Sequence, residues 1–215
     1  MSFEFISRIG LLILLCTILV SVFTAGTAVV CLMAGVKLTN IQIFFGKPVF
    51  IIPTRFAPVY IGYIPAGGGV TLDMDEFPRK PRSTRCLVAI AGPIAVLLSS
   101  LICLGPTHCW LSFVSTYSQI VQFVIAPFSD GKELISHFLL NAQLAPVKGY
   151  GILAAKIVAL HFIPMPSMPG GRLLFEMTNI GNSPIGLRVS NYVQSIVAVC
   201  VVGWIIVVTV RYFLH

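Results

Sequence analysis

Long apolar segments alternate with shorter polar segments along the chain. Four apolar segments are bounded by charged residues, glycine or proline: residues 9–36, 86–106, 149–166 and 194–213. A helix of about 20 apolar residues crosses the hydrocarbon core of a bilayer, and residues 9–36 contain no charged side chain. The pattern predicts an all-α polytopic membrane protein with about four transmembrane helices, forming one membrane domain over residues 1–215.

The segment between the first two predicted spans, residues 37–85, contains a different pattern. Residues 41–45 and 49–52 are rich in β-forming side chains, and Gly46-Lys47-Pro48 separates them as a turn signal. Residues 59–64 form another short β-type run, which the glycines at 67–69 follow. Because these runs are short and apolar, we expect a β-hairpin associated with the membrane rather than a separate soluble domain.

The segment between the second and third predicted spans, residues 107–148, must begin and end on the same side of the membrane if four spans hold. Residues 110–128 are uncharged but carry many serine, threonine and glutamine side chains. We expect extracytoplasmic interfacial or re-entrant helices here; whether residues 110–128 span or re-enter is left open. The segment is too short to hold a PDZ domain as well.

The composition agrees with a membrane protein. Apolar residues make up 57% of the chain and charged residues 10%, against roughly 25% in soluble domains. This balance excludes a water-soluble enzyme, a disordered chain and a disulfide-stapled mini-protein. The net charge of +7 does not indicate nucleic-acid binding, because the basic residues lie at the ends of apolar runs instead of forming a helical stripe.

Basic residues concentrate in residues 37–85 and 167–193, two loops that an odd number of crossings places on one side. Such loops face the cytoplasm, so we expect a multi-pass protein of the cell (inner) membrane with both basic loops cytoplasmic. Four of these residues form a cluster: Arg79, Lys80, Arg82 and Arg85. The cluster either anchors the chain at the membrane surface or contacts an anionic lipid or an acidic partner.

Three stretches are unusual in combination. They are Gly35-Val36-Lys37 followed by Phe44-Phe45-Gly46-Lys47 and Tyr63-Ile64-Pro65-Ala66-Gly67-Gly68, then Ala91-Gly92-Pro93-Ile94-Ala95, and finally His161-Phe162-Ile163-Pro164-Met165-Pro166-Ser167-Met168-Pro169-Gly170-Gly171-Arg172. In order and spacing they resemble the site-2 protease family of intramembrane zinc metalloproteases. The resemblance covers most of residues 9–213 and implies that family's transmembrane core.

The resemblance also implies where a zinc site would lie. In the family, a His-Glu-x-x-His motif in the first span supplies two ligands and a general base, and an aspartate before the double glycine supplies the third ligand. The matching positions here hold Phe23, Thr24, Thr27 and Pro169, and no Asp, Glu or His occurs between Phe5 and Leu72. We therefore expect no metal, no other cofactor and no catalytic residues, as in an inactive homologue.

A protein of this kind can still use the substrate groove that the resemblance implies. We expect that groove to hold an integral membrane partner, which would make the chain a subunit, assembly factor or regulator in contact with membrane lipids. The residues expected to line it are Phe44, Phe45, Tyr63, His161, Pro164, Pro166, Gly170 and Gly171.

Two further functions stay open at this point. One is an intramembrane metalloprotease with a relocated site; the other is a lipid or small-solute transport component in which Lys156 contacts an anionic head group. Lys156 lies inside the third predicted span, where it either extends toward the surface along its stem or makes a polar contact in the interior. We expect His161 to hydrogen-bond carbonyls freed by Pro164 and Pro166, and Arg172 to pair with Glu176.

Overall fold

The computed structural model describes residues 3–73, 75–126, 130–165 and 168–178, together with Tyr192 and Ile196. The elements follow in the order α1 (Phe3–Met33), β1 (Leu38–Phe45), β2 (Phe50–Ile52), β3 (Val59–Ile61), β4 (Ile64–Leu72), a 3-10 turn at Phe77–Arg79, α2 (Arg82–Ile125), α3 (Asp130–Leu144), α4 (Pro146–His161) and α5 (Pro169–Thr178). The fourth predicted span, residues 194–213, lies outside the described residues except for Ile196.

Two helices of the described part are long and apolar enough to cross a membrane. They are Gly10–Met33 within α1 and Arg82–Gln122 within α2, with mean hydropathies of 2.4 and 2.5. Many of their large apolar side chains face outward, including Leu14, Ile18 and Ile102, the last of which is 86% exposed. A bilayer would cover such side chains, so both helices agree with the spans predicted at 9–36 and 86–106.

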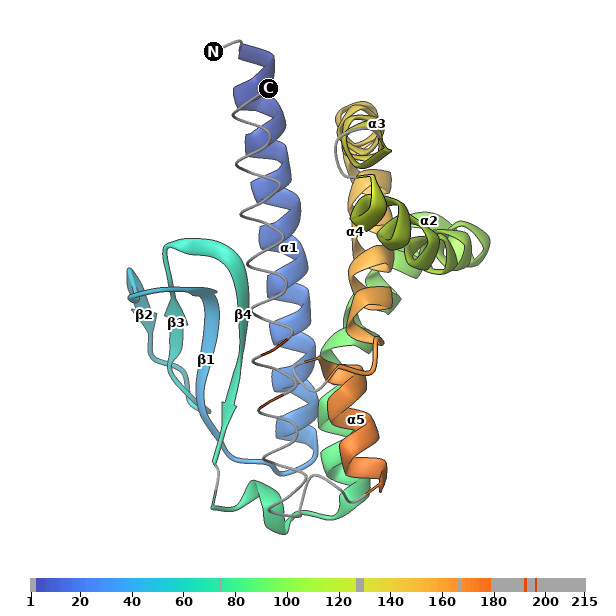
Figure 1. Cartoon of the computed structure of the whole chain (residues 1–215). Helices are drawn as coiled ribbons and strands as arrows, with labels where there is room; N and C mark the ends of the chain where they lie inside the picture. The colour runs from blue at the N-terminus through green and yellow to red at the C-terminus, as the bar shows by residue number, and fades with distance from the viewer. Residues whose placement is uncertain are drawn as a thin grey trace.

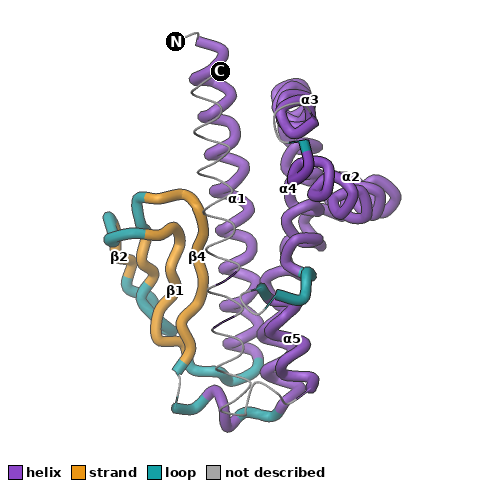
Figure 2. The backbone as a smooth tube through the Cα atoms, viewed as in Figure 1, coloured by secondary structure: helices purple, strands orange, loops and turns teal. Residues whose placement is uncertain are grey.

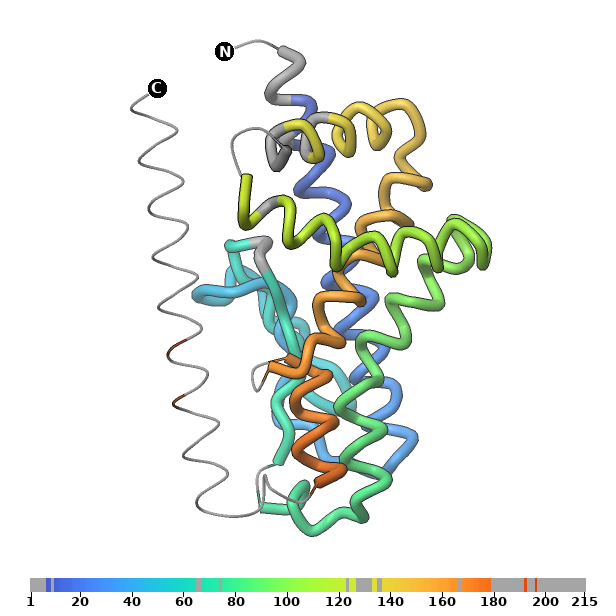
Figure 3. The backbone as a smooth tube through the Cα atoms, turned by 45° about the vertical axis from the view of Figure 1, so that its right-hand side comes forward, coloured from blue at the N-terminus to red at the C-terminus, as the bar shows by residue number. Residues whose placement is uncertain are grey.

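Helix α2 changes direction where the sequence predicted the end of the second span. Gly105 has φ 74° and ψ 167°, which lies outside the helical region, and Pro106 follows it. Proline cannot donate to the carbonyl one turn earlier and clashes with it, so the helix breaks at this pair. Beyond it, residues 107–125 run across the bundle instead of along α1 (Figure 3).

Helices α4 and α5 follow one another along α2 and are separated by the proline-containing segment (Figure 1). Small residues on α4 are buried at Gly149, Gly151, Ala154, Ala155 and Ala159. A Cβ on Gly151 would lie 2.6 Å from Cγ of Leu104, so glycine is needed for this close helix contact. One core cluster joins α1, α2, α3 and α4 here: Leu15, Leu19, Val96, Ala142, Tyr150, Ala154 and Val158.

The strands form a four-stranded sheet in the order β2-β3-β1-β4, and the predicted pairing of residues 41–45 with 49–52 is wrong. Strand β3 lies between them, parallel to β1 with Ile41 opposite Val59, and antiparallel to β2 with Ile51 opposite Tyr60. Phe44 and Gly46 have φ of 68° and 96°, so the chain leaves β1 in a left-handed conformation. A tight hairpin is therefore replaced by a longer excursion.

Strand β4 contains the glycine run that the sequence suggested would close the strand region. It pairs antiparallel with β1, with Gln42 opposite Gly69 and Ile43 opposite Gly68. A Cβ on Gly68 would lie 2.5 Å from the carbonyl oxygen of Gln42 and 2.9 Å from Cγ1 of Val20. Glycine thus lets β4 lie close to both β1 and α1, with β4 between β1 and α1 (Figure 2).

Ion pairs join the elements at the end of the bundle where α2 begins. The expected pairing of Glu176 with Arg172 is wrong, because Glu176 Oε2 accepts from Arg85 Nε at 2.8 Å, and the Glu176 carbonyl accepts from Arg82 Nε. Lys80 pairs with Glu76 at 2.6 Å and donates to the carbonyl of Gly35. Three residues of the predicted basic cluster therefore contact other parts of the chain: Lys80, Arg82 and Arg85.

A second pair at this end is more exposed. Lys37 Nζ lies 3.3 Å from Asp73 Oδ2. The backbone N–H of Asp75, together with Lys37, lowers the pKa of the Asp73 carboxyl. Asp73 thus caps the turn that leads from β4 to α2.

Breaking the Arg85–Glu176 pair should destabilise the fold more than breaking the Lys37–Asp73 pair. The Arg85 and Glu176 side chains are 10% and 21% exposed, so removing one charge leaves the other poorly solvated. We expect Arg85→Met to lower the free energy of unfolding by about 2 kcal/mol, between the values for exposed and buried pairs. Chemical denaturation in detergent measures this loss.

The control is Lys37→Met, since the Lys37 side chain is 71% exposed. It should cost less than about 0.5 kcal/mol. Arg85→Met combined with Glu176→Leu should recover part of the loss, because no unpaired charge remains. Equal losses for Arg85→Met and Lys37→Met would contradict a structural role for the Arg85–Glu176 pair.

Candidate functional site

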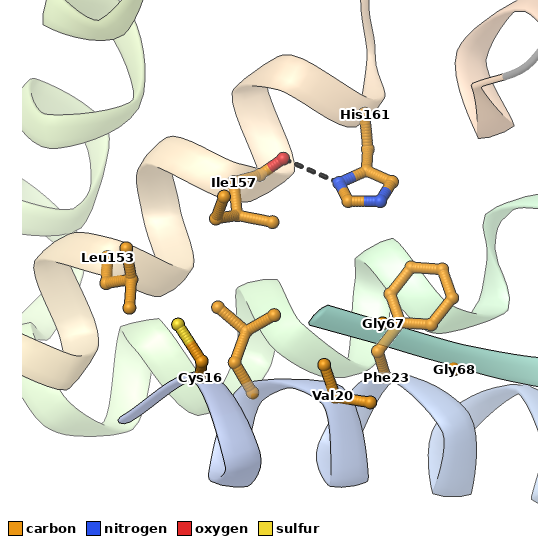
Figure 4. Close-up of a pocket in the computed structure, with 9 residues that line it drawn as sticks. Cys16, Val20, Phe23, Gly67, Gly68, Leu153, Ile157 and His161 are labelled. Atoms are coloured by element: carbon orange, nitrogen blue, oxygen red, sulfur yellow. Dashed lines mark hydrogen bonds between the residues drawn. The ribbon is translucent and has the colours of Figure 1, made fainter. Parts of the chain in front are cut away.

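A groove lies between α1, β4, the end of α4 and the start of α5, and it consists of two chambers. The first chamber has a volume of about 260 Å³ and is largely apolar. Its lining comes from three elements that are distant in the sequence: Cys16, Leu19, Val20 and Phe23 of α1, Gly67 and Gly68 of β4, and Leu153, Ile157 and His161 of α4 (Figure 4).

The second chamber continues the groove toward the start of α2 and α5. It has a volume of about 320 Å³ and is more polar than the first chamber. The described residues that line it are Phe23, Thr27, Gly68, Gly69, Val70, Leu72, Val88, Ala89, His161, Met168, Pro169 and Arg172.

Phe23 and His161 stand between the two chambers, because both residues line both of them. Their ring centroids are 5.1 Å apart with an interplanar angle of 37°. His161 Nδ1 lies 2.7 Å from the carbonyl oxygen of Ile157, so Nδ1 carries the proton of this hydrogen bond (Figure 4). We expected His161 to contact carbonyls freed by Pro164 and Pro166. Its partner is instead the carbonyl of Ile157, one helical turn before His161.

The Phe23 ring also packs against Gly92 of α2. A Cβ on Gly92 would lie 2.7–2.8 Å from three carbons of this ring. Gly92 belongs to the Ala91-Gly92-Pro93 stretch of α2, so this motif makes room for the aromatic side chain. Phe23 is thus held between Gly92 and His161.

The structure brings together most of the positions that the resemblance identified as zinc ligands. Phe23, Thr27 and Pro169 all line the second chamber, although α1 and α5 are far apart in the sequence. Thr24, at the position of the general base, is instead buried at 1% exposure, and its Oγ1 has no hydrogen-bond partner in the described part of the chain. A Cβ on Gly68 would lie 3.2 Å from this oxygen, which places Thr24 beneath β4.

The residues in this chamber do not fit a zinc ion. Phe23 and Pro169 have no donor atom in the side chain, and the Thr27 hydroxyl donates to the carbonyl of Phe23 at 3.0 Å. Zinc in proteins takes thiolate, imidazole or carboxylate ligands, three of them in a catalytic site. Among the described residues, no three His, Cys, Asp or Glu side chains lie close enough to hold a metal ion.

The residues predicted to line the groove divide into two groups. His161 lines both chambers. Of the others, Phe45 packs over Gly67 and Tyr63 over Gly46, while Pro164 is exposed. Phe44, Phe45, Tyr63, Pro164, Gly170 and Gly171 do not line the two chambers as the structure describes them, and Pro166 lies outside the described residues.

Sequence reasoning missed Cys16, Leu19 and Val20 of α1 and the β4 lining of the groove. Cys16, Val20, Phe23 and Thr27 follow each other at intervals of three or four residues, so they share one face of α1. Extending this face from Phe23 would have found the α1 side of the first chamber. Gly68 and Gly69 carried no such signal, because a glycine run also occurs in turns.

Lys156 makes an interior polar contact away from the groove. Its Nζ donates to Oε1 of Gln119 in the distal half of α2, and the side chain is half-buried. Tyr117, on the same segment, donates to the carbonyl of Ala159 at 3.2 Å. Of the two interpretations of Lys156, the structure favours the interior contact, which ties α4 to residues 107–125.

A comparison with models of known protein families places most of the chain in one family. The model of peptidase family M50, the site-2 protease family, matches residues 11–204, which is most of the chain. No curated protein sequence matches the chain.

Proposed function

The chain belongs to peptidase family M50, and from this premise we propose that it is a non-catalytic member that holds an extended segment of a membrane partner in its groove. The family is membrane-embedded. Helix α1, one of the two helices that are apolar enough to cross a membrane, lines both chambers of the groove. The chain would act as a subunit, assembly factor or regulator of a larger membrane complex.

The chemistry of the second chamber is the observation that supports a non-catalytic role. Phe23, Thr27 and Pro169 converge there, at the positions where the family resemblance puts metal ligands, and they provide one hydroxyl in total. The Phe23–His161 ring contact occupies the space between the chambers. Hydrolysis of a peptide bond needs an activated water, and Phe23, Thr27 and Pro169 offer neither the metal ligands nor the carboxylate that activate it in the family.

The position of β4 supports the binding of an extended segment. Strand β4 is at the end of the sheet, and its residues Gly67–Leu72 contribute to both chambers. An edge strand presents backbone N–H and C=O groups that can pair with an added strand. A partner segment lying along β4 would place its side chains in both chambers.

The distribution of charge supports a membrane topology for this proposal. The start of α2, which carries Arg82 and Arg85, lies at the end of the bundle where α5 ends (Figure 1). We place this end in the cytoplasm, in a multi-pass protein of the cell (inner) membrane. The second chamber is then on the cytoplasmic side of the groove.

A photo-crosslinking experiment tests partner binding in the native membrane. A benzophenone amino acid at Thr27 faces the second chamber, and the same amino acid at Ile102 faces away from the bundle. We expect the Thr27 probe to form one dominant protein adduct in which the crosslinked peptide is an extended juxtamembrane segment. The Ile102 probe should give lipid adducts or none, and an adduct pattern shared by both positions would contradict the groove.

A second variant puts a bulky side chain on the strand that lines the groove, at a position where a side chain has room. Gly69 lines the second chamber, and a Cβ built there meets no atom within 4 Å. We expect Gly69→Trp to reduce the Thr27 crosslink at least tenfold while leaving the thermal unfolding temperature within about 2 °C of the parent. The matched control is Ile52→Trp on the far edge strand β2, which should leave the crosslink unchanged.

Two results would favour the other functions. Release of a peptide product together with one bound zinc per chain would indicate a metalloprotease with a relocated site. Loss of solute or lipid transport in Lys156→Ala, with the partner adduct retained, would indicate a transport component. The first result without a Gly69-sensitive adduct, or the second result as stated, would overturn the proposed function.

A further inference from the structure

Arg172 lines the second chamber, and its side chain is exposed and has no partner among the described residues. The sequence offers Glu176 one helical turn later, but the Glu176 carboxylate binds Arg85 at 2.8 Å. The Arg172 side chain makes no hydrogen bond or ion pair within the described part of the chain, and only its backbone N–H donates, to Met168. Glu176 and Arg85 line a small adjoining cavity together with Arg172, so the Arg172 guanidinium is a solvated positive charge at the rim of the groove that is free to pair with a ligand.

The chamber around Arg172 carries no negative charge to balance it. None of the described residues that line it is acidic, and Arg172 is the one that is always charged. In the family resemblance, this chamber would hold a zinc cation bound by two imidazoles and a carboxylate. Here the positive charge belongs to the protein, at Arg172. A charged ligand that binds in this chamber should therefore carry a negative group.

From this charge distribution we infer that the groove selects a partner segment with a carboxylate at its cytoplasmic end. The inference rests on the proposed function and specifies its partner. The first chamber, lined by Leu19, Val20 and Leu153, takes a large apolar side chain. The carboxylate of an aspartate or glutamate then pairs with the Arg172 guanidinium, which can bind it with two hydrogen bonds.

The spacing along β4 relates these two groups. The first chamber lies beside Gly67 and Gly68, and the second extends beside Gly69 to Leu72. A strand advances about 3.3 Å per residue, and side chains two residues apart share a face. For a partner segment that runs parallel to β4, the acidic residue should therefore follow the apolar one by roughly two residues in the partner sequence.

A binding experiment with peptides tests this charge preference. The full chain is placed in nanodiscs of phosphatidylcholine, and fluorescein-labelled decapeptides of alternating valine and threonine serve as probes. Each peptide carries one leucine and, two positions later, glutamate, glutamine or lysine. Fluorescence anisotropy gives the dissociation constants.

We expect the glutamate peptide to bind about fivefold to tenfold more tightly than the glutamine peptide. Arg172→Gln should remove this preference, and Arg172→Glu should bind the lysine peptide best. The matched control is Arg79→Gln, a basic residue at the same end of the bundle that does not line the groove, and it should keep the preference. Unchanged thermal unfolding of each variant shows that the fold is retained.

The possible failures are distinguishable. If all three peptides bind the parent equally and Gly69→Trp blocks them, the groove holds a strand but has no preference for an acid, which overturns this inference alone. If Arg79→Gln removes the preference as Arg172→Gln does, the attraction is a general surface effect, and the inference is also wrong. If no peptide binds, both this inference and the proposed function fail.

An anionic lipid is the competing occupant, and the same system detects it. Nanodiscs of phosphatidylglycerol would then suppress binding of every peptide to the parent chain, and Arg172→Gln would relieve the suppression. That outcome would assign Arg172 to a lipid head group and overturn a peptide carboxylate as its ligand.

Discussion

Gly26→Leu should strongly destabilise the contact between α1 and α2. A Cβ at Gly26 would lie 2.2 Å from Cβ of Ala95 and 3.5 Å from the carbonyl oxygen of Ala91, both in α2. Real atoms do not approach so closely, so α1 and α2 must separate. We expect a loss of roughly 3 kcal/mol, at or above the usual range for overpacking.

The separation would also reach the groove. Gly26 lies one turn from Phe23, and Ala91 precedes Gly92, the seat of the Phe23 ring. Moving the two helices apart changes both contacts of this ring. The cost of the substitution should therefore include lost packing of Phe23 against Gly92 and His161.

A thiol-reactive dye measures this prediction. Cys31 and Cys109 are 0% and 1% exposed, so they react only when the structure opens. The matched control is Gly10→Leu in the same helix, where a Cβ meets no atom within 4 Å. Because leucine favours a helix over glycine by about 1 kcal/mol, the control should be neutral or stabilising, and equal losses at the two positions would refute the close helix contact.

The helices were predictable from the sequence because their signal is local. An uncharged run such as residues 9–36 is long enough to span, and its helix in the structure ends at Met33, close to Gly35 with φ 62°. The break of α2 at Gly105 and Pro106 was also predicted as the end of a segment. That the helix resumes at once in a new direction depends on its contacts with α4, which no local pattern records.

The sheet was predicted incompletely because its pairing is not local. Gly46-Lys47-Pro48 has the composition of a hairpin turn, yet β1 pairs with β3 and β4 instead of β2. The run at residues 67–69 has the composition of a turn as well, but these glycines belong to β4. They are needed where β4 meets Gln42 and Val20, and such a close approach becomes visible only when the elements are placed together.

The candidate site was also predictable only in part, because spacing along the chain was informative and tertiary contacts were not. Phe23, Thr27 and Pro169 were singled out from the family spacing, and all three line one chamber. The partner of Glu176 was predicted wrongly, because proximity along a helix favoured Arg172 while the fold brings Arg85 closer. The charge left on Arg172 is a consequence of that tertiary contact and could not be read from the sequence.

The second chamber should bind a metal when the ligand types of the family are placed in it. In the variant Phe23→His, Thr27→His and Pro169→Asp, two imidazoles stand four residues apart on one face of α1, and the carboxylate comes from the start of α5. Three such ligands and one water complete a tetrahedral site. We expect one Co²⁺ per chain with a dissociation constant in the micromolar range or below, detected by the visible absorption of tetrahedral cobalt, against no binding by the parent.

The control moves one ligand along the helix. Phe23→His, Val30→His and Pro169→Asp carries the same side chains, but residues 23 and 30 are about 10 Å apart along α1 at 1.5 Å per residue, too far to share one ion. A tetrahedral spectrum in the first variant alone would mean that the geometry of the family's metal site persists and that residue identity accounts for its absence here. A folded first variant that binds no cobalt would instead mean that the helices themselves have moved, and that Phe23 and Pro169 do not occupy ligand positions.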